Sequence, residues 1–222
     1  FWSGPMSNKW LVDIVNTDVV QHDMLRPANK YGYTLLQTEV TGFERDKKLV
    51  RTGHGLIEYD FLILSGGIRN DYEAWFGNDR KAADYTKAMF PAAYIPNAEH
   101  FKLKQSIQNF TGGDLVMTLP PPPHRCPPSP YERACLVADY FKKSKPKSKV
   151  VILDANEDVM SKKGLFTKAW SDLYKGIIEY RNNSEVKDVE VATNTAVLEF
   201  DKFKADVLNV IPPHRAGDIA HK

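Results

Sequence analysis

A strand, a proline-rich loop, a helix and a second strand follow one another in the middle of the chain, and this order most constrains the fold. Residues 114–119 and 150–153 are short apolar runs typical of buried strands. Between them, Ser129 is a favourable N-cap, and together with Glu132 it gives the S-x-x-E pattern of a capping box. A helix over residues 130–143 that joins two buried strands predicts a βαβ unit and a parallel sheet.

The elements that follow continue the same arrangement. A second helix is expected over residues 165–177, then three weaker strands and a closing apolar strand at 205–211. This is the order of a nucleotide-binding α/β unit. However, the turn after the first strand carries Pro120 to Pro123 where a G-x-G-x-x-G loop would stand. Proline lacks an amide hydrogen and fills the space of a pyrophosphate, so we expect a Rossmann-like, NAD-like domain that no longer binds a dinucleotide.

The first part of the chain has a different pattern. Short strands separated by turns predict an antiparallel β-meander, and a compact apolar run at residues 61–64 predicts a buried strand. Ser65, Gly66 and Gly67 follow that run and would let a ligand approach the backbone. The expected strands of the meander are residues 34–43, 48–52 and 56–59. Residues 69–97, which follow the glycines, are expected to be irregular.

Cys126 lies in the proline-rich loop just ahead of the predicted helix. The positive end of that helix, together with Arg125 and His124, favours the thiolate, so Cys126 is a candidate for redox or nucleophilic chemistry. The alternative is that Cys126 is only a small apolar side chain in a loop. The second cysteine, Cys135, falls on the core face of the helix, where we expect it to pack. Two cysteines without a histidine cluster make neither a disulfide framework nor a zinc site.

Composition excludes several classes of function. A net charge of +2 over 222 residues gives no electrostatic basis for nucleic-acid binding. No apolar run is long enough to cross a bilayer, and no signal peptide is present. Lysines crowd residues 142–149, which we interpret as a solvated helix end, with a docking patch for an acidic partner as the alternative.

Four segments carry a resemblance to a known family: residues 125–134, 145–154, 204–217 and 59–67. They resemble the flavoprotein subunit of flavocytochrome c sulfide dehydrogenase and, more distantly, the sulfide:quinone oxidoreductases. The resemblance spans nearly the whole chain. It implies an oxidoreductase that oxidises sulfide with FAD and passes the electrons to a cytochrome c or a quinone. It also implies a redox-active cysteine pair, of which Cys126 matches the first member.

The resemblance further implies a domain organisation. Residues 1–95 would be part of a discontinuous FAD-binding domain, residues 96–213 the second, NAD-like domain, and residues 214–222 the start of the return to the FAD domain. Because the chain opens on Phe1 and lacks the N-terminal FAD fingerprint of the family, we expect an interior fragment of a protein about twice as long. The family implies a periplasmic location.

The resemblance also implies site residues. Cys126 and Arg125 are the expected catalytic residues. The residues expected to bind FAD are Ser7 and Asn8 at the isoalloxazine, Val40 at the adenine, and Ser65, Gly66 and Gly67 near the phosphates and ribose. The FAD-linking cysteine of the family falls on Gly4 here, so any FAD would be non-covalent. The second redox cysteine of the family has no counterpart, and Cys135 is a poor substitute.

Three functions remain open from the sequence. In the first, sulfide attacks a disulfide that contains Cys126, giving a persulfide, and the other thiolate then reduces FAD. The second is a non-catalytic, flavin-free domain that only docks an electron-transfer partner. The third is NADH oxidation by the second domain, against which Pro120 to Pro123 argue.

Overall fold

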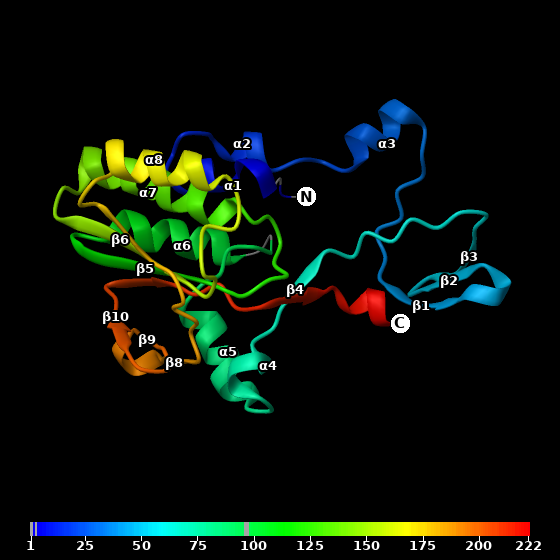
Figure 1. Ribbon diagram of the computed structural model, residues 1–222. Coiled ribbons are helices and arrows are strands. Elements are labelled where there is room, and N and C mark those ends of the chain that lie inside the picture. The colour runs from blue at the N-terminus through cyan, green and yellow to red at the C-terminus, as the bar shows by residue number, and fades with distance from the viewer. Residues whose placement is uncertain (1, 3, 96–97) are drawn as a thin grey trace.

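Figure 1 shows a computed structural model with a larger α/β body and a smaller lobe joined by extended segments. It describes residues 2, 4–95 and 98–222, so Phe1 and the predicted domain boundary at residue 96 lie outside the described part. Within the described residues, no helix is long and apolar enough to span a membrane.

A four-stranded parallel sheet with the order β11-β5-β6-β7 lies at the centre of the larger body. Its strands are β5 (Gly113–Leu119), β6 (Ser148–Asp154), β7 (Ile178–Arg181) and β11 (Val207–Asn209). β5 and β6 pair along their whole length, from Gly113 opposite Ser148 to Leu119 opposite Asp154. The helix α7 (Ser129–Ser144) connects them, which confirms the predicted βαβ unit.

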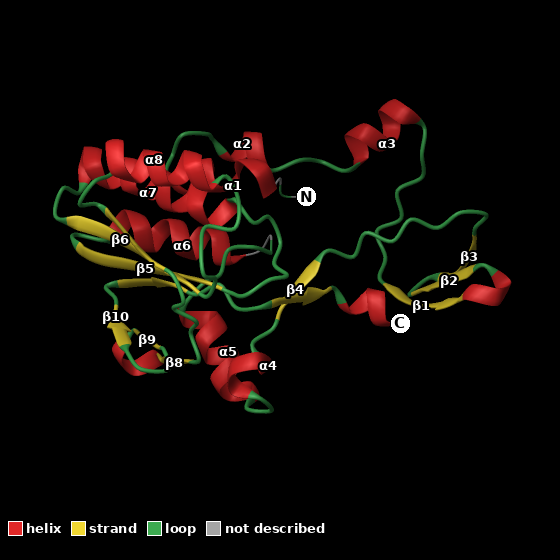
Figure 2. Ribbon diagram, viewed as in Figure 1, coloured by secondary structure: helices red, strands yellow, loops and turns green. Residues whose placement is uncertain are grey.

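Both faces of this sheet are covered, as Figure 2 shows. The helices α1 (Gly4–Leu11), α6 (Ala98–Asn109), α7 and α8 (Lys163–Asp172) lie on one face. The other face is covered by α5 (Arg80–Met89) and by the antiparallel strands β8 (Asp188–Glu190), β9 (Thr195–Val197) and β10 (Lys202–Lys204).

Side chains of the central strands alternate between the two cores. Leu115 and Met117 pack with the helices, whereas Val116 between them packs with the β8–β10 side. Because successive residues of a strand point to opposite faces, a continuous apolar run fits a sheet that is buried on both sides. The apolar runs in the sequence therefore predicted this sheet correctly.

The smaller lobe contains the predicted meander, although its first strand begins at Val40 and not at residue 34 as predicted. Its strands are β1 (Val40–Glu44), β2 (Leu49–Thr52) and β3 (Gly55–Glu58), paired antiparallel in the order β1-β2-β3. The chain between α1 and β1 forms the short helices α2 (Thr17–Val20) and α3 (Leu25–Tyr31). A two-stranded antiparallel ribbon of β4 (Ile68–Asn70) and β12 (His214–Ala216) lies where the lobe meets the larger body (Figure 1).

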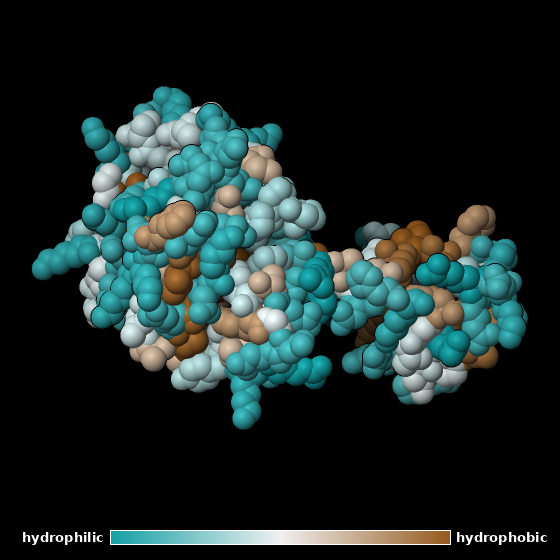
Figure 3. All heavy atoms as spheres, turned by 60° about the horizontal axis from the view of Figure 1, so that its bottom comes forward, coloured by the Kyte–Doolittle hydropathy of each residue, from teal (hydrophilic) through white to brown (hydrophobic). Residues whose placement is uncertain are grey.

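The strand predicted at residues 61–64 was wrong. This segment is an exposed loop, with Phe61 93% and Ile63 89% exposed. A strand needs a neighbour for its backbone groups and a covering layer for its side chains, and none of the described strands pairs with this segment. Figure 3 shows apolar side chains gathered on the smaller lobe, where exposed large side chains include Leu36, Leu56 and Phe61.

Residues 69–97 were predicted to be irregular, and for residues 69–89 this too was wrong, because they include most of β4, α4 (Glu73–Phe76) and α5. Residues 90–95 contain no helix or strand, as predicted, and residues 96–97 lie outside the described part. The signal for α5 was present, because the side chain of Asp79 caps the helix by accepting a hydrogen bond from the Ala82 amide at 3.0 Å. The helix predicted over residues 165–177 is shorter and ends at Asp172.

Candidate functional site

The loops that follow β5 and β11 meet at one edge of the sheet. β11 lies on one side of β5, and β6 and β7 lie on the other. This is the position where the strand order reverses, and α/β sheets bind ligands in the crevice at the carboxyl ends of such strands. The two loops are joined directly, because the Arg125 amide donates a hydrogen bond to Nδ1 of His214 at 2.9 Å.

Cys126 lies in the first of these loops. It is exposed, and its thiol forms no disulfide. Its φ is +55°, a left-handed conformation that is unfavourable for a residue with a Cβ atom. The Cys126 carbonyl accepts a hydrogen bond from the Ser129 amide at 2.9 Å, which holds the residue just before α7 begins. The predicted position of the thiol ahead of a helix N-terminus is therefore confirmed.

A pocket of about 350 Å³ lies beside Cys126. Its walls bring together Cys126, Arg125 and Ser7, three of the residues that sequence reasoning selected. The remaining lining residues are Trp2, Gly4, Pro5, Ala93, Tyr94, His100, Ser129, Glu132 and Arg133. The volume lies at the lower end of the roughly 300–1,000 Å³ of ligand sites, so the pocket suits a ring system or a small ligand.

Asn8 connects α1 to the start of α7. Its amide nitrogen donates to the carbonyl and hydroxyl of Ser129 and to the carboxylate of Glu132, at 3.0–3.1 Å. The predicted capping box is therefore absent: α7 begins at Ser129 itself, with Pro128 as N-cap and no side-chain cap. Ser129 and Glu132 accept hydrogen bonds from Asn8 instead, because α1 packs against this end of α7.

Arg133 is the most deeply buried charge of the site, at 3% exposed. Its guanidinium donates to Oδ1 of Asn8 and Asn209 and to the carbonyls of Ala92 and Ala93, at 2.7–2.9 Å. Burial lowers the pKa of Arg133. Sequence reasoning missed it, although an arginine next to Ala134 on the core side of a helix is an unusual position for a charge.

Three histidines surround this region and are held neutral by burial. Burial, followed by the charge of Arg133, lowers the pKa of His100 to about 4. Burial, followed by the charges of His124 and Arg125, lowers the pKa of His214 to about 4. Burial also lowers the pKa of His124. At neutral pH these rings are therefore neutral polar groups and add no positive charge beside Cys126.

Cys135 occupies a different environment. It is half-buried on α7 and packs against the helical core, as predicted. Burial raises the pKa of the Cys135 thiol, which makes it a poor nucleophile at neutral pH.

The other predicted FAD-binding residues lie away from this pocket. Val40 begins β1 in the smaller lobe, and none of Ser65, Gly66 and Gly67 lines the pocket. A Cβ atom on Gly66 would lie 2.3 Å from the Ile219 side chain, and Gly67 accepts a hydrogen bond from the Gly217 amide at 2.9 Å. At Gly66, the missing side chain allows two chain segments to pack closely.

The lysine cluster at residues 142–149 lies at the opposite edge of the sheet, where α7 ends and β6 begins. Several of its charges have partners: Lys143 pairs with Asp139 at 2.6 Å, and Lys145 donates to the Gln108 carbonyl at 2.8 Å. The cluster and Cys126 therefore lie at opposite ends of α7, which is about 24 Å long.

The carboxyl end of β6 carries a buried carboxylate, Asp154, at the position where a dinucleotide-binding fold would place a ribose ligand. Asp154 accepts hydrogen bonds from the hydroxyls of Tyr131 and Tyr180 at 2.6 and 3.0 Å. Its neighbour Asn156 also donates to it, at 2.6 Å. The carboxylate is thus already fully engaged, which agrees with the proline loop in arguing against dinucleotide binding.

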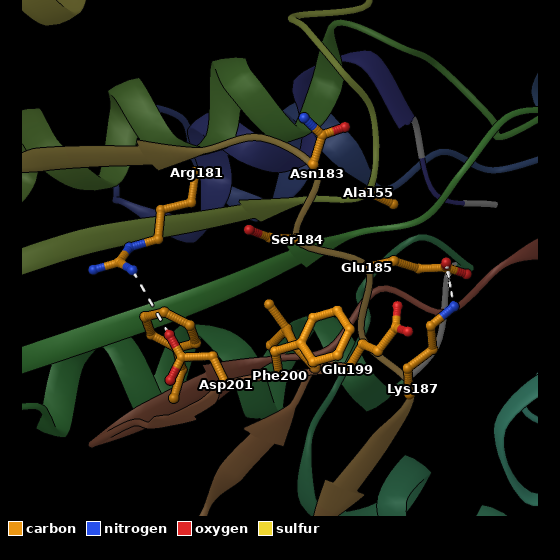
Figure 4. Close-up of a pocket in the computed structure, with 11 residues that line it drawn as sticks. Ala155, Arg181, Asn183, Ser184, Glu185, Lys187, Glu199, Phe200 and Asp201 are labelled. Atoms are coloured by element: carbon orange, nitrogen blue, oxygen red, sulfur yellow. Dashed lines mark hydrogen bonds and ion pairs between the residues drawn. The ribbon is translucent and has the colours of Figure 1, made fainter.

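A second pocket of about 430 Å³ lies beyond the ends of β6 and β7, on the side of the β8–β10 strands (Figure 4). Arg181 and Asp201 face each other across it with 4.0 Å between nitrogen and oxygen, and Lys187 pairs with Glu185. Its charges are largely paired with one another, and no residue selected from the sequence lines it.

Comparison with known proteins identifies the family to which this chain belongs. Residues 101–212, half of the chain, match the family described as the central part of the sulfide dehydrogenase (flavocytochrome c) flavoprotein chain. The chain belongs to this family. The match includes β5, the loop with Cys126, α7 and β11.

Solved structures agree on the fold of the whole chain. The sulfide:quinone oxidoreductase of Aquifex aeolicus superposes with a TM-score of 0.80 at 15% identity, over 100% of this chain and 52% of that protein. The ferredoxin reductase of the CYP199A2 system from Rhodopseudomonas palustris gives 0.64 at 15% identity, over 99% and 51%. Reduced CoADR-RHD of Bacillus anthracis gives 0.67 at 11% identity, over 96% and 37%. This chain therefore spans about half the length of the Aquifex protein.

Proposed function

We propose that this chain is part of a flavoprotein that oxidises sulfide through Cys126 and FAD and passes the electrons to a cytochrome c or a quinone. The observation that carries the proposal is the exposed Cys126 thiol, which lies at the N-terminus of α7 and on the wall of a pocket at the switch point of the sheet. Membership of the family supports the choice of FAD as cofactor and of sulfide as substrate in this proposal.

The residues of the pocket fit one end of FAD. The pocket is large enough for a flavin ring and too small for the whole cofactor, and Trp2 and Tyr94 give it aromatic walls. Ser7 and Ala93 would contact the ring, whereas the Asn8 amide is committed to Ser129 and Glu132. The roles of Val40, Ser65, Gly66 and Gly67 toward the rest of FAD remain a prediction. When bound, FAD supplies a two-electron acceptor.

The chemistry proposed for this chain's own residues begins with a disulfide in which Cys126 Sγ is one half. Hydrosulfide attacks that disulfide, so one S–S bond forms while the other breaks, and the electron pair leaves on the released thiolate. Cys126 retains the sulfur as a persulfide. The N-terminus of α7 and the Arg125 side chain, which lines the same pocket, favour the negative sulfur species. The partner is a cysteine other than Cys135, which is half-buried and packs against the helical core.

The test is a visible absorption spectrum of the longer flavoprotein of which this chain is part, with FAD added, recorded before and after anaerobic addition of sulfide. We expect a flavin band that bleaches with sulfide, slowly or not at all in Cys126→Ser, and normally in the matched control Cys135→Ser. A flavin band that sulfide leaves unchanged would contradict the proposal, and so would a Cys126→Ser protein that bleaches as fast as the unaltered one. NADH serves as the second reductant and is expected to bleach nothing.

A further inference from the structure

The ribbon formed by β4 and β12 ends beside the loop that carries Cys126. His214, the first residue of β12, pairs with Asn70 of β4. The next residue, Arg215, forms an ion pair with the buried carboxylate of Asp71 at 2.5 Å, and the Asp71 amide donates to the Pro213 carbonyl at 2.7 Å. The backbone at His214 is therefore fixed by contacts on both of its sides.

The imidazole of His214 is buried and faces the Cys126 loop. Its Nδ1 accepts the Arg125 amide at 2.9 Å, so in the neutral ring the proton lies on Nε2. The Tyr94 ring packs against it, with 5.1 Å between ring centroids. A buried ring held by a strand and an aromatic neighbour presents its acceptor nitrogen in one fixed position.

The residue after Arg125 needs such a support. Cys126 has a left-handed backbone conformation, which a residue with a Cβ atom keeps only when surrounding contacts hold it there. The Ser129 amide holds the carbonyl side of Cys126, and His214 holds the amide of the preceding residue. Together these two hydrogen bonds place the thiol against the start of α7 and the wall of the pocket.

We propose that His214 is a positioning residue for Cys126: by accepting the Arg125 amide, it fixes the strained loop so that the thiol stays at the N-terminus of α7. This role rests on the proposed function, since it serves the reaction of that thiol. It also connects the ribbon between the two parts of the molecule to the reactive sulfur.

The test compares His214→Asn with His214→Leu in the full chain, on a Cys135→Ser background. Asparagine places its carbonyl oxygen near the position of Nδ1 and can still accept the amide, whereas leucine fills the space without an acceptor. We expect the reaction of Cys126 with an aromatic disulfide reagent to slow about two- to five-fold in His214→Leu, the factor that a helix N-terminus contributes to the stability of an anion. His214→Asn should restore the rate.

Amide hydrogen exchange provides the readout that separates positioning from general damage. Protection of the Arg125 amide should be lost in His214→Leu and kept in His214→Asn, while amides of β5 and β6 stay protected in both. The remote variant His54→Ala controls for the loss of a histidine. Equal reaction rates and equal Arg125 protection in the leucine and asparagine variants would overturn the proposal.

The two proposals fail separately. If sulfide does not bleach the flavin of the unaltered protein, the sulfide function is wrong, yet the exchange and labelling results still test His214. If His214→Leu does not fold, His214→Ala replaces it, with the same asparagine rescue expected.

Discussion

At the residue scale, the site depends on side chains that hold one another across long stretches of sequence. Arg133 donates to Asn8, which lies 125 positions away in the chain, and Asn8 in turn donates to Ser129 and Glu132. Within the described residues, the buried guanidinium of Arg133 donates to neutral oxygens alone. Burying a charge in this way is unfavourable unless each of these hydrogen bonds is kept. Asn8 is therefore a structural link between α1 and α7, in addition to its proposed place near FAD.

Replacing Asn8 by Leu tests this link. Leucine keeps the branched shape but removes the acceptor of Arg133 and the donor to Glu132, so we expect a loss of about 1–3 kcal/mol in the free energy of unfolding. Urea unfolding followed by tryptophan fluorescence measures it. Asn16→Leu, at the N-cap of α2 where no side-chain capping bond is made, is the matched control and should change stability by less than about 0.5 kcal/mol. Equal effects of the two substitutions would contradict the assignment.

The two cysteines should react very differently. Cys126 is exposed at a helix N-terminus, whereas burial raises the pKa of Cys135. Near neutral pH we expect iodoacetamide to modify Cys126 at least about tenfold faster, and the rate at Cys135 to increase as the pH rises toward the pKa of its thiol. Peptide mass spectrometry over a time course gives both rates. Comparable rates at neutral pH would show that Cys126 has no special environment.

At the scale of elements, the βαβ unit and the segment at residues 61–64 differ in how deeply they bury similar side chains. Phe141 of α7 is fully buried in the helical core, whereas Phe61 is 93% exposed. Phe141→Ala should therefore cost about 3–5 kcal/mol in unfolding free energy. Phe61→Ala should change it by no more than about 0.5 kcal/mol. Thermal unfolding by circular dichroism distinguishes them, and a large loss in Phe61→Ala would mean that residues 61–64 are covered in solution.

The same contrast explains what could be predicted about the elements. The alternation of Leu115, Val116 and Met117 has a local cause, since each strand residue faces one of two apolar layers. The apolar run at residues 61–64 has the same local pattern, but its fate depends on a partner strand. Sequence periodicity cannot report whether a partner is present.

At the scale of the whole molecule, the two buried neutral histidines His100 and His214 couple stability to pH. The pKa of His100 and of His214 is lowered to about 4 by burial, while in the unfolded chain histidine titrates near 6.5. The unfolded chain therefore binds more protons between these two values, and the folded state loses stability as the pH falls from about 6.5 toward 4.

We expect the unfolding free energy to be flat from about pH 7 upward, as far as these groups are concerned, and to decrease below about pH 6.5. Each histidine contributes on the order of 1.4 kcal/mol per unit of pH once the unfolded form is protonated. Urea unfolding at a series of pH values measures the slope, and His214→Asn should reduce it. A slope that is unchanged in this variant would show that His214 is protonated in the folded state.

The arrangement of the site shows where local sequence information ends. The loop with Cys126 ahead of α7 was predictable, because a strand, prolines and a helix start are all encoded within about thirty neighbouring residues. The burial of Arg133 was not predictable, and neither were the hydrogen bonds from Asn8 to Ser129 and Glu132 that replace the capping box. Both depend on α1 packing against α7. The meeting of Arg125 with His214 depends on β11 lying beside β5.

What the sequence by itself determined is the set of elements whose causes are local: the apolar strands β5 and β6, the helix between them, the meander, and a thiol placed at a helix start. Tertiary structure alone decided which distant groups meet, namely Asn8 with Arg133 and Arg125 with His214, and which apolar run stays exposed. The physical reason is that hydrogen-bond partners and covering layers are supplied by segments tens of residues away, and a pattern within one segment carries no information about them.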